Sequence, residues 1–167
     1  NTQSCAVTTE RWCSWMTYQR RQPPNLLKQQ LKLSSLIIPE YYAAHTAIWS
    51  GEYNEYLGDG GRGSLKSTFA ATEVVLLIMR VPNIHAVVLR KVGNTLATSV
   101  WPEYNRVIAR MGIRHLWRQT KKPYTLTYIP TGQTIQFYGL DDPGKLKSIA
   151  VPFGYFGVMH FEEFDQY

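Results

Sequence analysis

The fold of this chain is decided by the stretch Gly60-Gly61-Arg62-Gly63-Ser64-Leu65-Lys66-Ser67-Thr68. Its three glycines permit positive φ angles and a close approach of the backbone to a ligand. The apolar pattern from Phe69 to Met79 predicts a helix directly after it. Backbone N–H groups of such a turn, together with the N-terminus of the next helix, bind anionic oxygens. Residues 60–68 are therefore predicted to form a phosphate-binding loop.

Two side chains of this loop have definite predicted roles. Lys66 is expected to reach the β- and γ-phosphates of a nucleotide, and the Ser67 hydroxyl is expected to ligate Mg²⁺. One position departs from the usual Gly-x-x-x-x-Gly-Lys-Ser/Thr pattern, because Leu65 precedes the lysine. A Cβ at this position is expected to crowd the phosphates or to change the shape of the loop. A glycine-rich turn before a helix, without nucleotide chemistry, is the alternative.

A second informative stretch, YFGVMHFEE, covers residues 155–163. Its apolar part, Val158 to Phe161, predicts a strand that is followed by two adjacent acids, Glu162 and Glu163. A magnesium-bound triphosphate requires a carboxylate for the metal and a group that orients the attacking water. We expect Glu162 to serve the metal and Glu163 the water. Because neighbouring residues of a strand face opposite ways, the strand must end or bend there. An exposed acidic pair at a strand end is the alternative.

The apolar patterns predict alternating helices and strands. Helices are expected over residues 41–49, 65–80 and 100–111, single strands over 55–57, 86–89 and 158–161, and a β-hairpin from strands 124–129 and 134–138. This order is typical of an α/β fold with a mainly parallel sheet, into which the hairpin is inserted.

The composition narrows the class of protein. A chain of 167 residues with 44% hydrophobic and 18% charged residues is globular and of single-domain size. The net charge of +6 favours polyanionic partners such as nucleic acid or nucleotides, although a merely basic surface explains it equally well. Cys5 and Cys13 lack metal-ligand spacing and are expected to be free thiols. The absence of a long apolar run or a signal peptide predicts a cytoplasmic protein without membrane contact.

Several segments together resemble the large terminase subunits of tailed bacteriophages, of the PBSX type. The loop at residues 60–67 is similar to the phosphate loop of that family. Residues 88–100 are similar to its second strand and helix start, and residues 128–143 are similar to its hairpin and loop. Residues 145–149 and the acidic strand end at 161–163 complete the resemblance. The order and spacing match from about Ile38 to the end. The resemblance implies a RecA-like P-loop NTPase fold, with residues 1–37 as an N-terminal extension and 38–167 as an ATPase core. It also implies that this core is C-terminally truncated and lacks the nuclease domain of the family.

The same resemblance implies a function. ATP hydrolysis, with ATP and Mg²⁺ as cofactors, would drive double-stranded DNA into a capsid. The expected partners are the portal protein and a small terminase subunit, within a homo-oligomeric ring at the procapsid portal in the host cytoplasm. Arg62 would contact the γ-phosphate or sense its loss, and Lys66 and Glu163 would complete the catalytic set. Because fast turnover needs an arginine from a neighbouring subunit, the isolated chain is expected to be a weak ATPase.

Other interpretations remain open at this stage. The chain is alternatively a non-catalytic nucleotide- or DNA-binding fragment, a helicase-like translocase, or a metal nuclease that uses Asp141, Asp142 and the two terminal-strand glutamates. Tyr41 and Tyr42 are candidates for stacking on adenine. Arg90 and Lys91 either face DNA or a neighbouring subunit, or form a charged strand end. No role is assigned to the four histidines, His45, His85, His115 and His160.

Overall fold

The centre of the fold is a strand that is buried along nearly its whole length. In the computed structural model, which describes residues 32–51, 54–61, 63–141 and 149–163, β1 (Ile84–Arg90) is buried at every position except Arg90. It pairs in parallel with β4 (Thr134–Gly139) on one side and with β5 (Tyr155–Glu162) on the other. A continuous apolar run is typical of such a strand, because both of its faces are covered.

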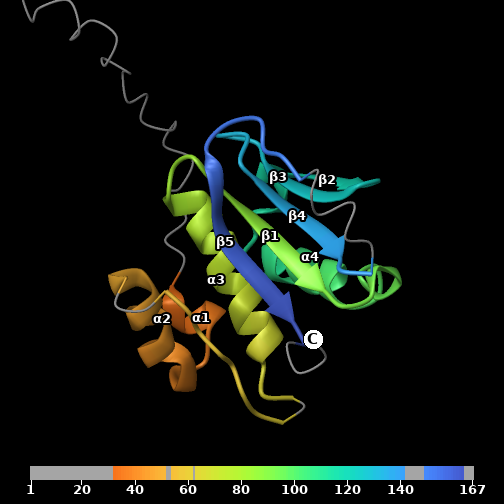
Figure 1. Cartoon of the computed structure of the whole chain (residues 1–167). Coiled ribbons are helices and arrows are strands. Elements are labelled where there is room, and N and C mark those ends of the chain that lie inside the picture. Colours follow the sequence, from red (N-terminus) through yellow and green to blue (C-terminus); the bar gives the residue numbers. More distant parts are fainter. Residues whose placement is uncertain (1–31, 52–53, 62, 142–148, 164–167) are drawn as a thin grey trace, which may run out of the picture. The chain divides into compact units, whose positions relative to one another are not determined.

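The sheet has the strand order β2-β3-β4-β1-β5 (Figure 1). β2 (Trp117–Lys121) and β3 (Tyr124–Tyr128) form an antiparallel pair, and β3 pairs antiparallel with β4, which confirms the predicted hairpin. The sheet is therefore mixed, whereas the sequence predicted a mainly parallel one. The difference comes from β2, which the sequence analysis missed. After Trp117 this edge strand has only exposed polar residues, so it shows no alternation of apolar and polar positions.

Two helices cover one face of the sheet (Figure 1). They are α3 (Lys66–Arg80) and α4 (Val100–Arg110), which confirm two of the predicted helices to within a residue or two. Both contribute buried side chains to a common core with one face of β1, β3 and β4. A short helix α1 (Leu33–Leu36), a 3₁₀ turn η3 (Pro39–Tyr41) and α2 (Tyr42–Ser50) precede the glycine loop. Two further 3₁₀ turns, η4 (Gly93–Thr95) and η5 (Arg114–Leu116), lie on either side of α4 in the sequence.

The opposite face of the sheet is more polar. His85 is fully buried there, and its Nδ1 accepts a hydrogen bond of 3.0 Å from the Thr134 backbone N–H. The His85 and Phe153 rings form a T-shaped contact, with 4.7 Å between their centroids. Gln136 donates a hydrogen bond to the carbonyl of Ala150. The segment before β5 therefore packs on this face, and burial lowers the pKa of His85 despite hydrogen bonding to the Phe153 backbone.

One predicted strand does not form. Residues 55–57 have no regular secondary structure, and Leu57 is 79% exposed. A strand requires a neighbouring strand for its backbone hydrogen bonds, and none of the strands in the described part of the chain pairs with this segment. Within the described ranges, no helix is both long and apolar enough to span a membrane.

Candidate nucleotide and metal site

The glycine loop adopts left-handed backbone conformations at several positions. Gly60 and Gly63 have φ angles of 139° and 86°, and Leu65 has a φ angle of 61°. Position 65, which is glycine in the usual pattern, thus has a backbone conformation that favours glycine. A side chain in this conformation costs about 1–2 kcal/mol, because Cβ approaches the following carbonyl oxygen. The loop therefore keeps its shape at a conformational cost. Leu65 is 47% exposed.

Lys66, the first residue of α3, directs its amine into the curve of the loop. The Nζ atom donates a hydrogen bond to the carbonyl oxygen of Gly60. A Cβ added to Gly60 would lie 3.6 Å from the Nζ atom. The ammonium group therefore lies among the backbone groups of the glycine turn, where it can contact an anion bound by that turn.

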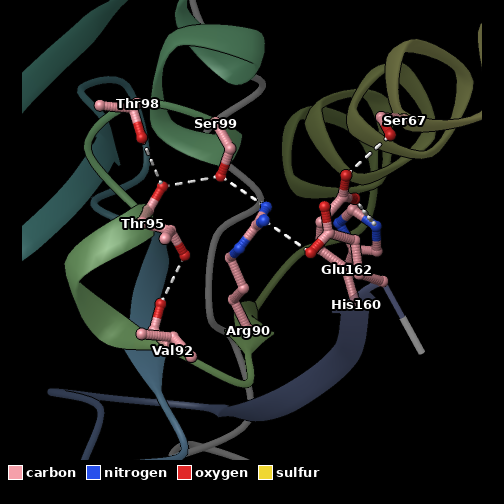
Figure 2. Close-up of polar contacts among 9 residues, drawn as sticks. Ser67, Arg90, Val92, Thr95, Thr98, Ser99, His160 and Glu162 are labelled. Atoms are coloured by element: carbon pink, nitrogen blue, oxygen red, sulfur yellow. Dashed lines mark hydrogen bonds and ion pairs between the residues drawn. The ribbon is translucent and has the colours of Figure 1, made fainter. Parts of the chain in front are cut away.

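The start of α3 and the end of β5 meet at two side chains (Figure 2). The Ser67 hydroxyl donates a hydrogen bond of 2.8 Å to Oε1 of Glu162. Burial acts to raise the pKa of Glu162, but hydrogen bonds from His160 and Ser67, with the positive charge of Arg90, outweigh it, so the pKa lies below its ordinary value. Glu162 is thus a carboxylate at neutral pH.

His160 supports Glu162 from the same face of β5. Its Nε2 lies 3.3 Å from Oε2 of Glu162, and its Nδ1 lies 2.9 Å from the hydroxyl of Tyr104 on α4. Tyr104 is fully buried, and both burial and the charge of Glu162 raise its pKa well above the ordinary value, so the hydroxyl stays protonated and can donate to Nδ1. His160 has no role that the sequence alone indicates. A spacing of two residues on a strand is the signal that places both side chains on one face.

The strand bends at the acidic pair, as expected. β5 ends at Glu162, and Glu163 has a φ angle of 56°. Glu163 Oε2 lies 2.5 Å from Nη2 of Arg90, whose Nη1 donates a hydrogen bond of 2.6 Å to the hydroxyl of Ser99. Figure 2 shows Arg90 between Ser99 and the end of β5. Arg90 therefore pairs within the chain, and does not project outward toward a partner.

The remaining loop positions have different surroundings. Thr68 donates a hydrogen bond of 2.6 Å to Glu103 on α4, and the Ser64 N–H is 3.4 Å from the Gly61 carbonyl oxygen. Arg62 lies outside the described residues, so its predicted contact with the γ-phosphate stays a prediction.

Tyr41, a candidate for stacking on adenine, contacts both α3 and the glycine loop. One face of its ring stacks on Phe69, with 4.4 Å between centroids and 9° between planes, and its hydroxyl donates to the Ser64 carbonyl oxygen. A side chain of α3 therefore occupies one face of the Tyr41 ring, and stacking of Tyr41 or Tyr42 on a base stays a prediction.

The described acids among those proposed for a nuclease, Asp141, Glu162 and Glu163, do not form a metal-binding group. Asp141 accepts a hydrogen bond of 3.1 Å from the backbone N–H of Gly93, and Asp142 lies outside the described residues. In the part of the chain that the structure describes, no three His, Cys, Asp or Glu side chains are arranged to hold a metal ion. A metal at this site would need ligands from elsewhere, as a nucleotide-bound Mg²⁺ has from phosphate oxygens and water.

The residues present fit such a magnesium nucleotide. A hydroxyl oxygen and an ionised carboxylate meet at Ser67 and Glu162, and oxygen ligands of these types suit Mg²⁺. The Lys66 ammonium group and the N-terminus of α3 supply positive charge next to them. The assignment of Lys66, Ser67, Glu162 and Glu163 to phosphate, metal and water stays a prediction.

This chain is similar in sequence to known proteins. A family model described as the phage terminase large subunit matches residues 54–167. The terminase large subunit of Bacillus phage SPP1 is 38% identical over 121 residues, which cover 72% of this chain and 28% of that protein. The PBSX phage terminase large subunit of Bacillus subtilis (strain 168) is 33% identical over 112 residues, which cover 67% of this chain and 25% of that protein.

The chain thus spans about a quarter of the length of these relatives. The residues matched by the family model include the glycine loop, α3, the whole sheet and the acidic end of β5. On these grounds the chain belongs to the phage terminase large subunit family.

Proposed function

We propose that this chain is an ATPase region of a DNA-packaging motor, in which hydrolysis of magnesium-bound ATP drives translocation of double-stranded DNA. The observation that carries the proposal is the hydrogen bond between Ser67 and Glu162, which joins the glycine loop's helix to the acidic strand end. Phosphoryl-transfer sites require this juxtaposition of a phosphate loop and a metal-binding carboxylate. The parallel strands β4, β1 and β5 beside α3 are compatible with a RecA-like P-loop core.

Each site residue has a role in this proposal. The backbone of residues 60–68 and the Lys66 ammonium group bind the phosphates, and Ser67 and Glu162 hold Mg²⁺. When bound, the magnesium nucleotide supplies the reacting phosphoryl group and the metal that stabilises its charge. Glu163 orients the attacking water, and Arg62 contacts the γ-phosphate. Because fast hydrolysis in this class needs an arginine from a neighbouring subunit, the chain on its own is expected to turn over slowly.

The charge distribution supports DNA as the translocated partner. Residues 104–140 contain no acidic residue, and their basic side chains are Arg106, Arg110, Arg114, Arg118, Lys121 and Lys122. The basic residues of η5 and β2 in this segment, together with Lys122, are all exposed. Clustered basic side chains at a polar strand bind nucleic-acid phosphates independently of sequence. Within the proposed motor, a portal protein, a small terminase subunit and further copies of the chain in a ring are the other partners.

Nucleotide binding and phosphate release, measured on three proteins, test the proposal. The wild type is expected to bind a magnesium-bound ATP analogue and to release phosphate slowly. Glu163→Gln should bind with similar affinity and lose phosphate release, whereas Lys66→Ala should lose binding. Equal binding by wild type and Lys66→Ala would overturn the proposal, because the loop amine would then have no part in recognition.

One observation favours a second candidate, a region that binds nucleotide or DNA without turnover. The ion pair between Arg90 and Glu163 occupies the carboxylate that would orient water. The same measurements separate the two functions. Binding that depends on Lys66, with no phosphate release above the Glu163→Gln background, would establish the non-catalytic candidate.

A further inference from the structure

The helix before the glycine loop, α2, is attached to α3 through hydrogen bonds to one buried glutamate. α2 has no buried residue, yet two of its side chains reach the same carboxylate on α3. His45 Nδ1 lies 2.8 Å from Oε1 of Glu73, and Trp49 Nε1 donates a hydrogen bond of 2.8 Å to Oε2. Residues four apart lie on one face of a helix. A single face of α2 therefore engages both oxygens of Glu73.

Glu73 is a costly residue to place at this position. It is 3% exposed, and it lies on α3 less than two turns beyond Ser67. A buried carboxylate is tolerated when hydrogen bonds satisfy its oxygens, as His45 and Trp49 do here. The carboxylate therefore links α2 to the same helix that begins at the glycine loop.

Tyr41, which directly precedes α2, extends this link into the loop itself. Its ring stacks on Phe69, and its hydroxyl donates a hydrogen bond of 2.7 Å to the Ser64 carbonyl oxygen. The C=O and N–H of a trans peptide point in opposite directions. A fixed Ser64 carbonyl therefore directs the Leu65 N–H away from Tyr41. This peptide leads into the left-handed residue Leu65, where the backbone conformation is costly to maintain.

We propose that Tyr41 is a positioning residue for the phosphate loop, and that α2, anchored on the buried Glu73, holds Tyr41 in place. The inference rests on the proposed nucleotide-binding function, and it assigns to η3 and α2 the task of pre-forming the anion site. A loop held in its binding conformation before the ligand arrives loses less conformational entropy on binding. The tyrosine then acts on affinity through the peptide between Ser64 and Leu65, and it does not touch the reacting atoms.

The variant Tyr41→Phe tests this role sharply, because it keeps the stack on Phe69 and removes only the hydroxyl. We expect the Kd for a magnesium-bound, non-hydrolysable ATP analogue to rise about 3- to 10-fold, the usual range for one hydrogen bond. The KM for ATP should rise with it, while kcat and the Tm stay close to wild type. The matched control is Tyr155→Phe, which removes the hydroxyl of an exposed tyrosine on β5 and should leave all four quantities unchanged.

A second pair of variants tests the anchor. Glu73→Ala should weaken analogue binding in the same direction as Tyr41→Phe. Glu73→Gln should recover part of the affinity, because its amide still accepts a hydrogen bond from Trp49. If both variants bind the analogue with wild-type affinity, the link from Glu73 to the loop is absent.

Amide hydrogen exchange provides a readout that needs no nucleotide. Tyr41→Phe is expected to speed exchange in residues 60–66 and to leave the buried part of α3, residues 71–78, unchanged. Unaltered exchange in the loop would overturn the inference, even if the wild type binds nucleotide. A wild type that binds no nucleotide, together with faster loop exchange in Tyr41→Phe, would instead overturn the proposed function and retain the positioning role.

Discussion

The Ser67 hydroxyl donates a hydrogen bond to Glu162 across 95 positions of sequence. The contact is possible because β5 lies beside β1 and its carboxyl end reaches the first turn of α3. In the proposed function these two oxygens bind one magnesium ion, so each is expected to affect the metal dependence of nucleotide binding.

The first prediction concerns this dependence. Ser67→Ala removes the hydroxyl but keeps the helix start, since alanine is a good helix former. The Mg²⁺ concentration that half-saturates analogue binding should rise about tenfold or more, because a charge-assisted contact contributes about 1.5–3 kcal/mol. Titration of Mg²⁺ at fixed analogue concentration measures this shift. Thr46→Ala, on the exposed surface of α2, is the control. A similar shift in that variant would show that the effect does not come from a contact between Ser67 and Mg²⁺.

The second prediction concerns the cost of Leu65. Leu65→Gly should stabilise the protein by about 0.5–1 kcal/mol, because the relief of a left-handed side-chain conformation exceeds the entropy that glycine loses on folding. Urea unfolding measures the difference in the free energy of unfolding. Leu65→Ala retains a Cβ at a φ angle of 61° and should give no such gain. Equal stabilisation by both variants would show that the exposed leucine side chain, and not its backbone, is unfavourable.

The third prediction follows from the buried His85. Its pKa in the folded protein is lowered by burial, so the unfolded chain binds a proton more readily than the folded one. The corresponding stability is fully present above the unfolded pKa, about 6.5, and is lost as the pH falls toward the folded pKa. The free energy of unfolding should therefore decline as the pH falls below about 6.5.

His85→Gln should reduce this decline, whatever its effect on stability at pH 7. The exposed His115 provides the control, and His115→Gln should retain the wild-type slope. Urea unfolding in EDTA at a series of pH values gives both slopes. A wild-type slope that survives in His85→Gln would assign the decline to other groups.

The fourth prediction concerns the basic edge strand. Arg118→Glu and Lys121→Glu should each weaken binding of the chain to duplex DNA and lower the slope of log affinity against log salt by about 1 for each lost phosphate contact. The exposed Lys32, outside this segment, is the matched control. Fluorescence anisotropy over a series of salt concentrations measures both effects. Equal losses for Lys32→Glu would show that net charge, and not the β2 surface, governs DNA binding.

The sequence by itself determined most of the elements and the two ends of the site. Three glycines before an apolar helix, a continuous apolar run at β1 and a turn between two alternating segments are local patterns, so they specify α3, β1 and the β3–β4 hairpin without reference to the rest of the chain. The hypothesis that Glu162 and Glu163 serve one site predicted that the strand ends or bends at that point, and β5 ends at Glu162.

Only the tertiary structure decided what these residues contact. Residues 55–57 have a strand-like sequence but no strand beside them, and β2 forms despite an uninformative pattern because β3 offers it an edge. Glu73, Tyr41, Arg90 and His160 each have a hydrogen-bond partner that lies between 23 and 73 positions away. Hydrogen bonds at such separations depend on how the sheet and helices pack, and no local pattern of residues encodes that packing.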